Sequence, residues 1–389
     1  MAYIIKAFRT AVTKAGKGAF KNTRSDDLAA HLIMELMKET PEIDPSLVDG
    51  ILVGCANPEG EQGLQIGRQI ALLSLGKNTP GVTINRYCGS GLETIAMATA
   101  MIRSGMGDVY IAGGTESMSM IPMTGYKFAP NYNMSAFTPD YLVGMGTTAE
   151  AVGSKYNISR AASDAFALAS HQKAGKAIDE GKFKDEIIPF TVNEIYVEND
   201  QRKSDSMEVD TDDGVRRDTS LEALSGLRPV FKRNGIVTAG NSSQTSDGAS
   251  FTLIVSEKIL KEFDLTPMAS LKSYAVAGVD PLYMGIGPVK AIPKALVQAD
   301  LRLDQIEQIE LNEAFAAQAL AVIQEAGLNP DIVNVNGGAI ALGHPLGCTG
   351  AKLTTQLIHE MKRRKQKYGM VSACIGGGQG VAGIFEIFN

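Results

Sequence analysis

A chain of 389 residues is longer than one hydrophobic core usually supports, so we expect two or more packed units. The net charge of −6 argues against a broad nucleic-acid-binding surface, and the four widely spaced cysteines exclude a disulfide framework or a paired zinc-ligand motif. We find no signal peptide, no apolar run of membrane-spanning length and no peroxisomal ending, so we expect a cytoplasmic protein.

Strand and helix patterns alternate through the first part of the chain. After a strand-like run at 1–8, the apolar periodicity predicts helices at 26–38 and 65–75. Buried strands are predicted at 48–54 and 108–114, each ending in glycine. This alternation is typical of a mostly parallel sheet covered by helices.

The most informative stretch covers residues 82–101, where a β-branched run leads into Cys88 and an apolar-periodic run follows. The pattern predicts a strand, a tight turn and a helix, with Cys88 at the start of the helix. A thiol there faces the positive end of the helix dipole and free backbone N–H groups, which favour the reactive thiolate. A small buried hydrophobic side chain would explain this stretch equally well.

The alternation breaks in the middle of the chain. Residues 117–136 are rich in Met, Pro, Tyr and Gly, helices are predicted near 147–156 and 159–180, and polar sequence fills 191–226. We interpret this block as an inserted subdomain, and binding residues often lie on inserted loops of this kind. The Met and Tyr residues of 118–134 also suit a contact with another subunit.

A second α/β segment follows and repeats the plan of the first. Its predicted elements are strands at 306–311, 332–336 and 368–374, and helices at 289–299 and from Ala351. A buried strand predicted at 249–255 precedes this segment and belongs to the first. The matching strands lie roughly 250 to 260 residues apart, which favours a duplication. We therefore divide the chain into a first half (1–117 plus 248–267), an inserted domain (118–247) and a second half (268–389).

A cysteine nucleophile needs a base, and the chain has only four histidines. His31, His171 and His359 lie in helical patterns, and we interpret them as packed or solvated side chains. His344 lies in the glycine-rich loop 337–350, and Pro345 fixes the chain after it. His344 is therefore the candidate base.

Two further strand ends carry candidate chemistry. Cys374 begins the glycine run 374–380, whose bare backbone N–H groups can bind an oxyanion. Asn312 follows the strand at 306–311 and can position a water, although Asn is also a common cap. The carboxyl ends of parallel strands share one edge of a sheet, which we call the rim. These side chains are therefore predicted to converge with Cys88 at the rim.

Four blocks of the sequence resemble the signature blocks of the thiolases, in the same order and across nearly the whole chain. The blocks are residues 85–91, 312–315, 337–350 and 374–380. The resemblance implies two duplicated α/β halves, stacked as α-β-α-β-α layers, with an inserted loop domain over the site. It also implies acyl transfer between coenzyme A thioesters.

The resemblance implies a role for each rim residue. Cys88 looks like the nucleophile that carries the acyl group, and Cys374 like the acid/base at the methyl carbon of acetyl-CoA. His344 would activate Cys88 and, with a water held by Asn312, stabilise the enolate oxygen. The backbone N–H groups of Cys88 and Gly376 would hold the thioester oxygen. No metal and no cofactor are implied, since coenzyme A is a substrate.

Similarity also suggests the binding residues. They are Arg216, Phe231, Ala239 and Ser243 near the coenzyme A tail, and Met145 and Phe315 near the acyl group. Arg217, Lys232 and Arg233 are phosphate candidates on charge alone. The expected partners are acyl-CoA, 3-ketoacyl-CoA and CoA, with assembly as a homodimer or homotetramer and neither nucleic-acid binding nor membrane insertion.

Departures from the family pattern favour one specificity. Thiolases that form acetoacetyl-CoA usually carry His where this chain has Gly144, and both the run 244–247 and Cys348 resemble the 3-ketoacyl-CoA thiolases of fatty-acid β-oxidation. We therefore expect an acetyl-CoA C-acyltransferase of broad chain length. The alternatives are an acetyl-CoA C-acetyltransferase, a decarboxylating ketoacyl synthase, which lacks a second catalytic thiol, and a non-catalytic acyl-CoA- or lipid-binding relative.

Overall fold

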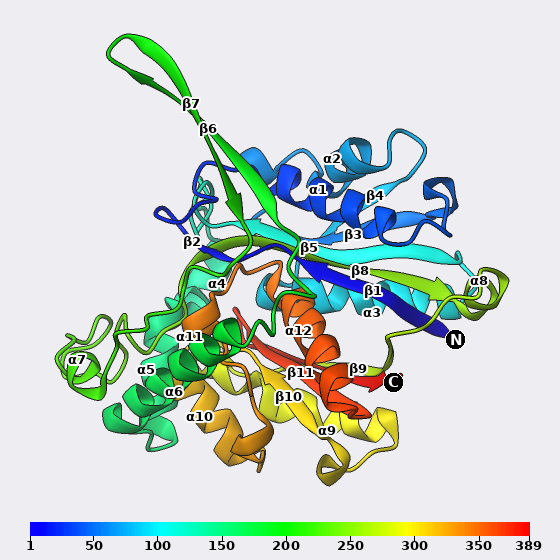
Figure 1. Cartoon of the computed structure of the whole chain (residues 1–389). Coiled ribbons are helices and arrows are strands. Elements are labelled where there is room, and N and C mark those ends of the chain that lie inside the picture. The colour runs from blue at the N-terminus through cyan, green and yellow to red at the C-terminus, as the bar shows by residue number, and fades with distance from the viewer.

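The computed structural model describes residues 1–389, and its centre is a 10-stranded sheet drawn from both halves of the chain (Figure 1). The first half supplies β1 (Ala2–Arg9), β2 (Thr13–Lys14), β3 (Gly50–Gly54), β4 (Gly81–Ile84), β5 (Val109–Ser117) and β8 (Ser246–Ser256). The second supplies β9 (Ala269–Gly278), β10 (Gln308–Leu311), β11 (Tyr368–Ile375) and β12 (Gln379–Ile387). The order is β10-β11-β12-β9-β1-β8-β5-β3-β4, with β2 beside β8. Strands β1 and β9 meet at one register pair, Ile4 and Ala269, so the two halves of the sheet join at a narrow junction.

The two halves repeat one topology, as the sequence predicted. Strand β3 runs parallel to β5, while β5–β8 and β8–β1 are antiparallel. In the second half β10 runs parallel to β11, while β11–β12 and β12–β9 are antiparallel. The order of parallel and antiparallel pairs is therefore the same in both halves, counted from the parallel pair to the β1–β9 junction.

The predicted strand at 332–336 is wrong. Only a single parallel bridge, Ile309 to Val333, stands where β4 pairs with β3 in the first half. Asn334 has a φ of +46°, outside the extended region. Its side chain accepts a hydrogen bond from Leu311 N and donates one to Leu311 O, both 2.8 Å long. A side-chain amide therefore replaces the backbone pairing that a strand would make.

Helices cover both faces of each half-sheet, which gives the expected α-β-α-β-α layers (Figure 1). The outer helices are α1 (Ser25–Lys38) and α2 (Ile66–Ser74) on the first half, and α9 (Gly287–Ala299) and α10 (Ala316–Glu325) on the second; α3 (Ser90–Arg103) and α12 (Thr349–Arg364) lie between the halves. Ile51 and Val53 pack toward α1, whereas Leu52 packs toward α3, because alternate strand residues face opposite sides. The predicted helices at 26–38, 65–75 and 289–299 are confirmed within two residues at each end.

The two central helices approach each other at glycines. A Cβ on Gly350 would lie 2.3 Å from Leu92 N, and a Cβ on Gly91 would lie 2.6 Å from Ala351 N. Any side chain at these positions would push α3 and α12 apart. Because Cys88 precedes α3 and His344 precedes α12, this close packing brings their two loops together.

The inserted region contains more regular structure than its sequence indicated. The predicted helices are confirmed as α5 (Met145–Lys155) and α6 (Arg160–Asp179), and α4 (Tyr132–Phe137) and α7 (Leu221–Ser225) are short. The polar stretch at 191–226 is not irregular throughout, because β6 (Phe190–Glu198) and β7 (Gln201–Val209) form a hairpin that projects from the body (Figure 1). Most of its residues are exposed on both faces, so no alternating apolar pattern marks it. The remaining helices are α8 (Glu257–Glu262) and α11 (Ala339–Leu342).

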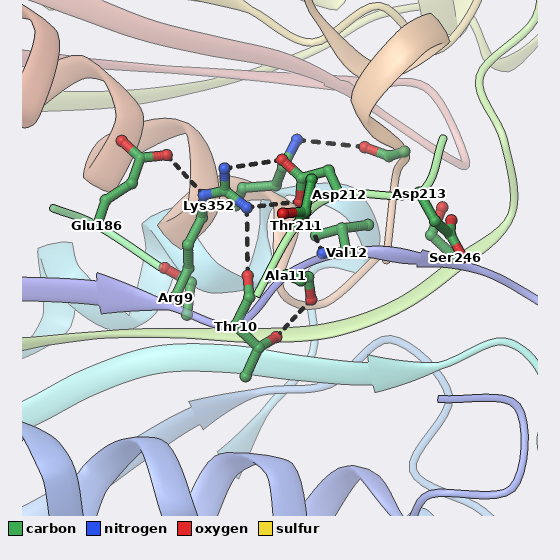
Figure 2. Close-up of polar contacts among 12 residues, drawn as sticks. Arg9, Thr10, Ala11, Val12, Glu186, Thr211, Asp212, Asp213, Ser246 and Lys352 are labelled. Carbon is green, nitrogen blue, oxygen red and sulfur yellow. Dashed lines mark hydrogen bonds and ion pairs between the residues drawn. The ribbon is translucent and has the colours of Figure 1, made fainter. Parts of the chain in front are cut away.

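A buried arginine holds both ends of this hairpin (Figure 2). Arg9 Nε donates to Glu186, which precedes β6, over 2.7 Å. Its two terminal nitrogens donate to the carboxylate of Asp212, which follows β7, over 2.7 and 2.9 Å. Val12 N donates to the same carboxylate over 2.7 Å. These paired, buried charges fix the start of the loop that carries Arg216 against the first half.

None of the helices combines the length and the apolar character that a bilayer-spanning segment requires.

Candidate active site

The structure brings the predicted rim residues together around one cavity of about 480 Å³. Cys88, His344, Cys374 and Gly376 all line it. The inserted region closes one side with mostly apolar side chains. These are Met123, Phe128, Tyr141, Leu142, Val143 and Met145. Both halves and the inserted region therefore contribute to the same cavity.

Cys88 lies in a one-turn 3-10 helix, Tyr87–Gly89, directly before α3. Tyr87 has a φ of +43°, and Ser90 Oγ stabilises this turn by donating to Tyr87 O over 2.7 Å. Burial raises the pKa of the Cys88 thiol to about 11, although the backbone N–H groups of Gly376 and Cys88 act in the opposite direction. The expectation of a stabilised thiolate is therefore wrong, because desolvation outweighs the helix start, and the resting group is a thiol.

His344 is held as the tautomer that leaves Nε2 unprotonated. Its Nδ1 lies 2.6 Å from Thr349 Oγ1, and the Thr349 hydroxyl donates to Pro345 O over 2.9 Å. Since that hydroxyl has a single proton, Nδ1 must supply the proton of its own hydrogen bond. The Asn312 amide nitrogen, a donor, lies 3.3 Å from Nε2. Burial lowers the pKa of His344 to about 3, so the ring is neutral.

The loop around His344 is fixed on both sides. His344 N donates to Ser246 Oγ and to Gln244 O, each over 3.1 Å, so the run 244–247 packs against this loop. On the other side, Lys352 Nζ donates to Gly343 O over 3.4 Å. Lys352 is buried beside Arg9 and Asp212, and its positive charge adds to the lowering of the His344 pKa (Figure 2). The peptide group between Gly343 and His344 is thus tied to α12 through its carbonyl and to the start of β8 through its N–H.

Cys374 lies near the end of β11 and is buried against Met284 and Ala314. Burial, together with the nearby Cys88, raises the pKa of Cys374 far above its ordinary value. Its resting form is therefore also a thiol. Gly376, next along the cavity wall, directs its backbone N–H to the Cys88 sulfur. A proton donor and an oxyanion donor thus stand beside the candidate nucleophile.

Asn312 lies behind the cavity rather than on its wall. It follows β10, is fully buried and contacts Nε2 of His344. Its carbonyl oxygen has no hydrogen-bond partner. A buried amide oxygen without a partner fits a bound water, which is the role the sequence suggested for Asn312.

The predicted binding residues separate into groups. Met145, Ser243 and Phe315 line the thiol cavity. Phe231 packs edge-to-face on Phe315, with ring centroids 6.4 Å apart. Ala239 is exposed on the surface and does not line the cavity. The thiol cavity and its neighbouring wall thus include four of the six residues.

Arg216 lines a second cavity, of about 410 Å³, beside α6. Its backbone N–H donates to His171 Nδ1 over 3.1 Å, and burial lowers the pKa of His171 to about 4. Arg217 lines the same cavity and forms a solvent-exposed ion pair of 2.9 Å with Asp179. Sequence reasoning missed His171 here because its helix has little amphipathic pattern.

Sequence reasoning also missed Thr349 and Tyr141. Thr349 lies inside the loop 337–350, so a count of hydrogen-bonding side chains in that loop could have found it. Tyr141 lies in a short 3-10 helix, Pro139–Leu142, and packs on Gly377, where a Cβ would lie 2.7 Å from its ring. No periodicity marks a residue of this kind.

Two protonated thiols, a neutral imidazole and backbone N–H groups at glycine-rich strand ends define a site for cysteine-based acyl transfer. The comparisons with known proteins agree. Residues 2–258 match the thiolase N-terminal domain, and residues 265–387 match the thiolase C-terminal domain. The chain therefore belongs to the thiolase family of acyltransferases.

Individual relatives cover nearly the whole chain. The 3-ketoacyl-CoA thiolase of Bacillus subtilis is 50% identical over 99% of both chains, and that of Pseudoalteromonas translucida is 43% identical over 98% of both. Among solved structures, the Bacillus anthracis acetyl-CoA acetyltransferase is similar with a TM-score of 0.89 and 38% identity. That match covers 100% of this chain and 98% of the other.

Proposed function

We propose that this protein is a 3-ketoacyl-CoA thiolase, an acetyl-CoA C-acyltransferase. It cleaves a 3-ketoacyl-CoA with CoA into acetyl-CoA and a shortened acyl-CoA, and it catalyses the reverse condensation. The observation that carries this proposal is the second thiol, Cys374, in the same cavity as Cys88 and His344. A decarboxylating synthase has no use for that thiol, and a mere binding protein needs no neutral base beside a cysteine.

The first step breaks the carbon–carbon bond. His344 Nε2 takes the Cys88 proton as the sulfur attacks the 3-keto carbon. The bond between C2 and C3 then breaks, and its electron pair forms the enolate of acetyl-CoA. Cys374 delivers its proton to C2, acetyl-CoA leaves, and the acyl group remains on Cys88 as a thioester. The raised pKa of Cys374 keeps the proton in place until a carbanion forms.

The second step releases the acyl group. The thiol of CoA gives its proton to the Cys374 thiolate and attacks the thioester carbon. Cys88 leaves as a thiolate and recovers its proton from His344. One thioester replaces another, so the exchange has little net cost. Attack of Cys88 on the 3-keto carbon and attack of CoA on the acyl-Cys88 thioester both place negative charge on the oxygen of the attacked carbon, which the N–H groups of Cys88 and Gly376 would stabilise. His344 and an Asn312-held water would stabilise the enolate oxygen of acetyl-CoA.

We propose no metal and no redox cofactor for this cycle, because no electrons are exchanged and the chain itself supplies the base, the acid and the oxyanion donors. Coenzyme A enters as a substrate.

The acyl side of the cavity favours a broad chain length. Gly144 lines the cavity, and a Cβ placed there would meet nothing within 4 Å. The wall beside it is largely apolar, from Met123, Phe128 and Leu142. An acetyl-CoA C-acetyltransferase is the second candidate, since the similar Bacillus anthracis structure carries that name. Steady-state thiolysis of C4 to C16 3-ketoacyl-CoAs tests the choice, and activity confined to acetoacetyl-CoA would contradict ours.

We further propose a role in fatty-acid β-oxidation, a cytoplasmic location and assembly as a homodimer or homotetramer. Reduced thiols are required for the mechanism, and a reducing compartment maintains them. Phe128, Tyr132 and Phe137 are strongly exposed in the region before α5, which suits an interface between subunits. The division into 1–117 plus 248–267, 118–247 and 268–389 also remains our proposal for the domains.

A further inference from the structure

One buried carboxylate beside the thiol cavity has no part in the mechanism above. Glu116, near the end of β5, has no solvent exposure. Its oxygen Oε2 accepts hydrogen bonds from Ala56 N and Gly347 N, over 2.7 and 2.8 Å. Its oxygen Oε1 accepts from Gln62 Nε2 over 2.7 Å and from Asn57 N over 3.2 Å. The Cys55 thiol is a further donor, with its sulfur 3.7 Å from Oε1. Burial raises the pKa of Glu116, but every one of these partners is a donor, so the site fits the ionised carboxylate.

These hydrogen bonds join the two loops that carry the candidate nucleophile and base. Gly347 belongs to the loop of His344 and sits so close that a Cβ on it would lie 2.7 Å from Glu116 Oε2. On the other side, Ala56 O accepts from the side chain of Asn85 over 2.9 Å. Asn85 in turn accepts from Tyr87 N, next to Cys88, over 2.9 Å. The carboxylate is thus the common point between the His344 loop and the turn of Cys88.

The repeat gives Glu116 a counterpart in the second half, Cys374, which is the acid of the proposed function. Gly114 stands opposite Gly54, the last residue of β3, and Ser372 stands opposite Leu311, the last residue of β10. Two residues further along each strand come Glu116 and Cys374. The same rim position therefore holds a thiol in the second half and a buried carboxylate in the first.

We propose that Glu116 is a positioning residue, whose carboxylate clamps the loop after β3 to the loop of His344 and thereby fixes His344 relative to Cys88. This inference rests on the proposed function, in which His344 takes the proton of Cys88. The negative charge has a second effect, because it opposes formation of the Cys88 thiolate. Burial is the main reason that Cys88 stays protonated, and the Glu116 charge adds to it.

Two substitutions separate the clamp from the charge. Glu116→Gln keeps the size but turns an N–H group toward other donors and removes the charge, whereas Glu116→Asp keeps the charge but cannot reach both loops. We expect both to lower kcat for acetoacetyl-CoA thiolysis on the order of 10²-fold with little change in KM, as a misplaced base does. Only Glu116→Gln should speed alkylation of Cys88 by iodoacetamide near pH 7, about tenfold for each unit by which its pKa falls.

The alkylation is read by peptide mass spectrometry, so that each cysteine reports separately. Fully buried Cys348 should stay unlabelled, which shows that the variants remain folded. His344, Cys374 and Tyr87, the other titratable groups around Cys88, are unchanged in these variants. Glu150→Gln is the matched control, since that buried carboxylate accepts from Ile236 N and Val237 N, and none of these residues lines the thiol cavity. It should lower the melting temperature and leave kcat unchanged.

The proposal is overturned if folded Glu116→Gln retains the wild-type kcat, or if its Cys88 reacts no faster than in the wild type. Labelling of Cys348 in both Glu116 variants would show a purely structural residue and would also overturn it. Failure of the wild-type protein to cleave any 3-ketoacyl-CoA contradicts the proposed function instead. The alkylation pattern does not depend on turnover, so the two failures are distinguishable.

Discussion

The two halves of the molecule share a strand order but carry different chemistry at the same edge of the sheet. The first half places Cys55, Cys88 and Glu116 near strand ends or in the loops beyond them, and the second places Asn312, His344 and Cys374 there. The duplicated scaffold therefore provides equivalent positions, and different side chains at those positions give the two halves different chemical groups. In the proposed mechanism the first half supplies the nucleophile and the charge of Glu116, while the second supplies the base and the second thiol.

The largest predicted effect tests whether the two thiols are interchangeable. Cys88→Ala should abolish acyl transfer, with a loss of at least about 10⁴-fold in kcat, because no other side chain can carry the acyl group. Cys374→Ala should still accept a labelled acetyl group from acetyl-CoA on Cys88 but should not condense it. Mass spectrometry of the trapped acyl-enzyme and a condensation assay measure both. Normal condensation by Cys374→Ala would remove that thiol from the mechanism.

The next effect concerns how the second half orients its base. Thr349→Val keeps the shape of the side chain but removes the acceptor for the Nδ1 proton of His344. We expect kcat to fall on the order of 10²-fold with little change in KM, because the imidazole loses its fixed tautomer and orientation. Thr349→Ser restores the hydroxyl and should recover most of the activity. Equal losses in the Val and Ser variants would show that packing, rather than the hydrogen bond, matters here.

A smaller effect is expected on the acyl side. Gly144→His fills open space in the cavity wall, so it should reduce kcat/KM for long-chain 3-ketoacyl-CoAs about tenfold and spare acetoacetyl-CoA. Gly144→Ala is the matched control, since its added methyl group meets nothing within 4 Å. A uniform loss across C4 to C16 substrates would show that Gly144 does not determine chain length.

The rim was predictable from the sequence because its chemistry lies in short blocks at strand ends. Cys88, His344 and Cys374 each stand within or beside glycine-rich turns, and parallel strands bring such turns to one edge. The hairpin β6–β7 was not predictable, since most of its residues face solvent on both sides and show no apolar alternation. The fold class can thus be predicted from the pattern of apolar residues, whereas the projecting β6–β7 hairpin cannot.

Properties that depend on burial could not be predicted from local sequence. The helix start at Cys88 indicated a thiolate, yet the surrounding protein raises the thiol pKa to about 11. Asn334 replaces a strand through its side chain, and a β-like run of residues cannot reveal that. The role of Glu116 depends on which loops meet its two oxygens. Each of these features belongs to the packing between segments far apart in the chain.

The smallest predicted effect uses pH to compare folded and unfolded His344. Its folded pKa of about 3 lies below the ordinary value of 6.5, so below pH 6.5 the unfolded chain binds a proton that the native protein does not. Stability is therefore lost as the pH falls from 6.5 toward 3, by about 1.4 kcal/mol per pH unit for this one group. His171, lowered to about 4, acts in the same direction.

Glu310 opposes this trend over part of the range, because burial raises its pKa to about 8 and the native protein binds a proton there that the unfolded chain binds only near pH 4.5. The contribution of His344 is therefore isolated by difference. Urea unfolding of the wild type and of His344→Gln between pH 4.5 and 7.5 should give free energies that converge as the pH falls, because the variant cannot take up the proton. Parallel curves would mean that folded His344 keeps a pKa near its ordinary value of 6.5. In that case burial would not hold the imidazole neutral below that pH, and the second half would lose its neutral base there.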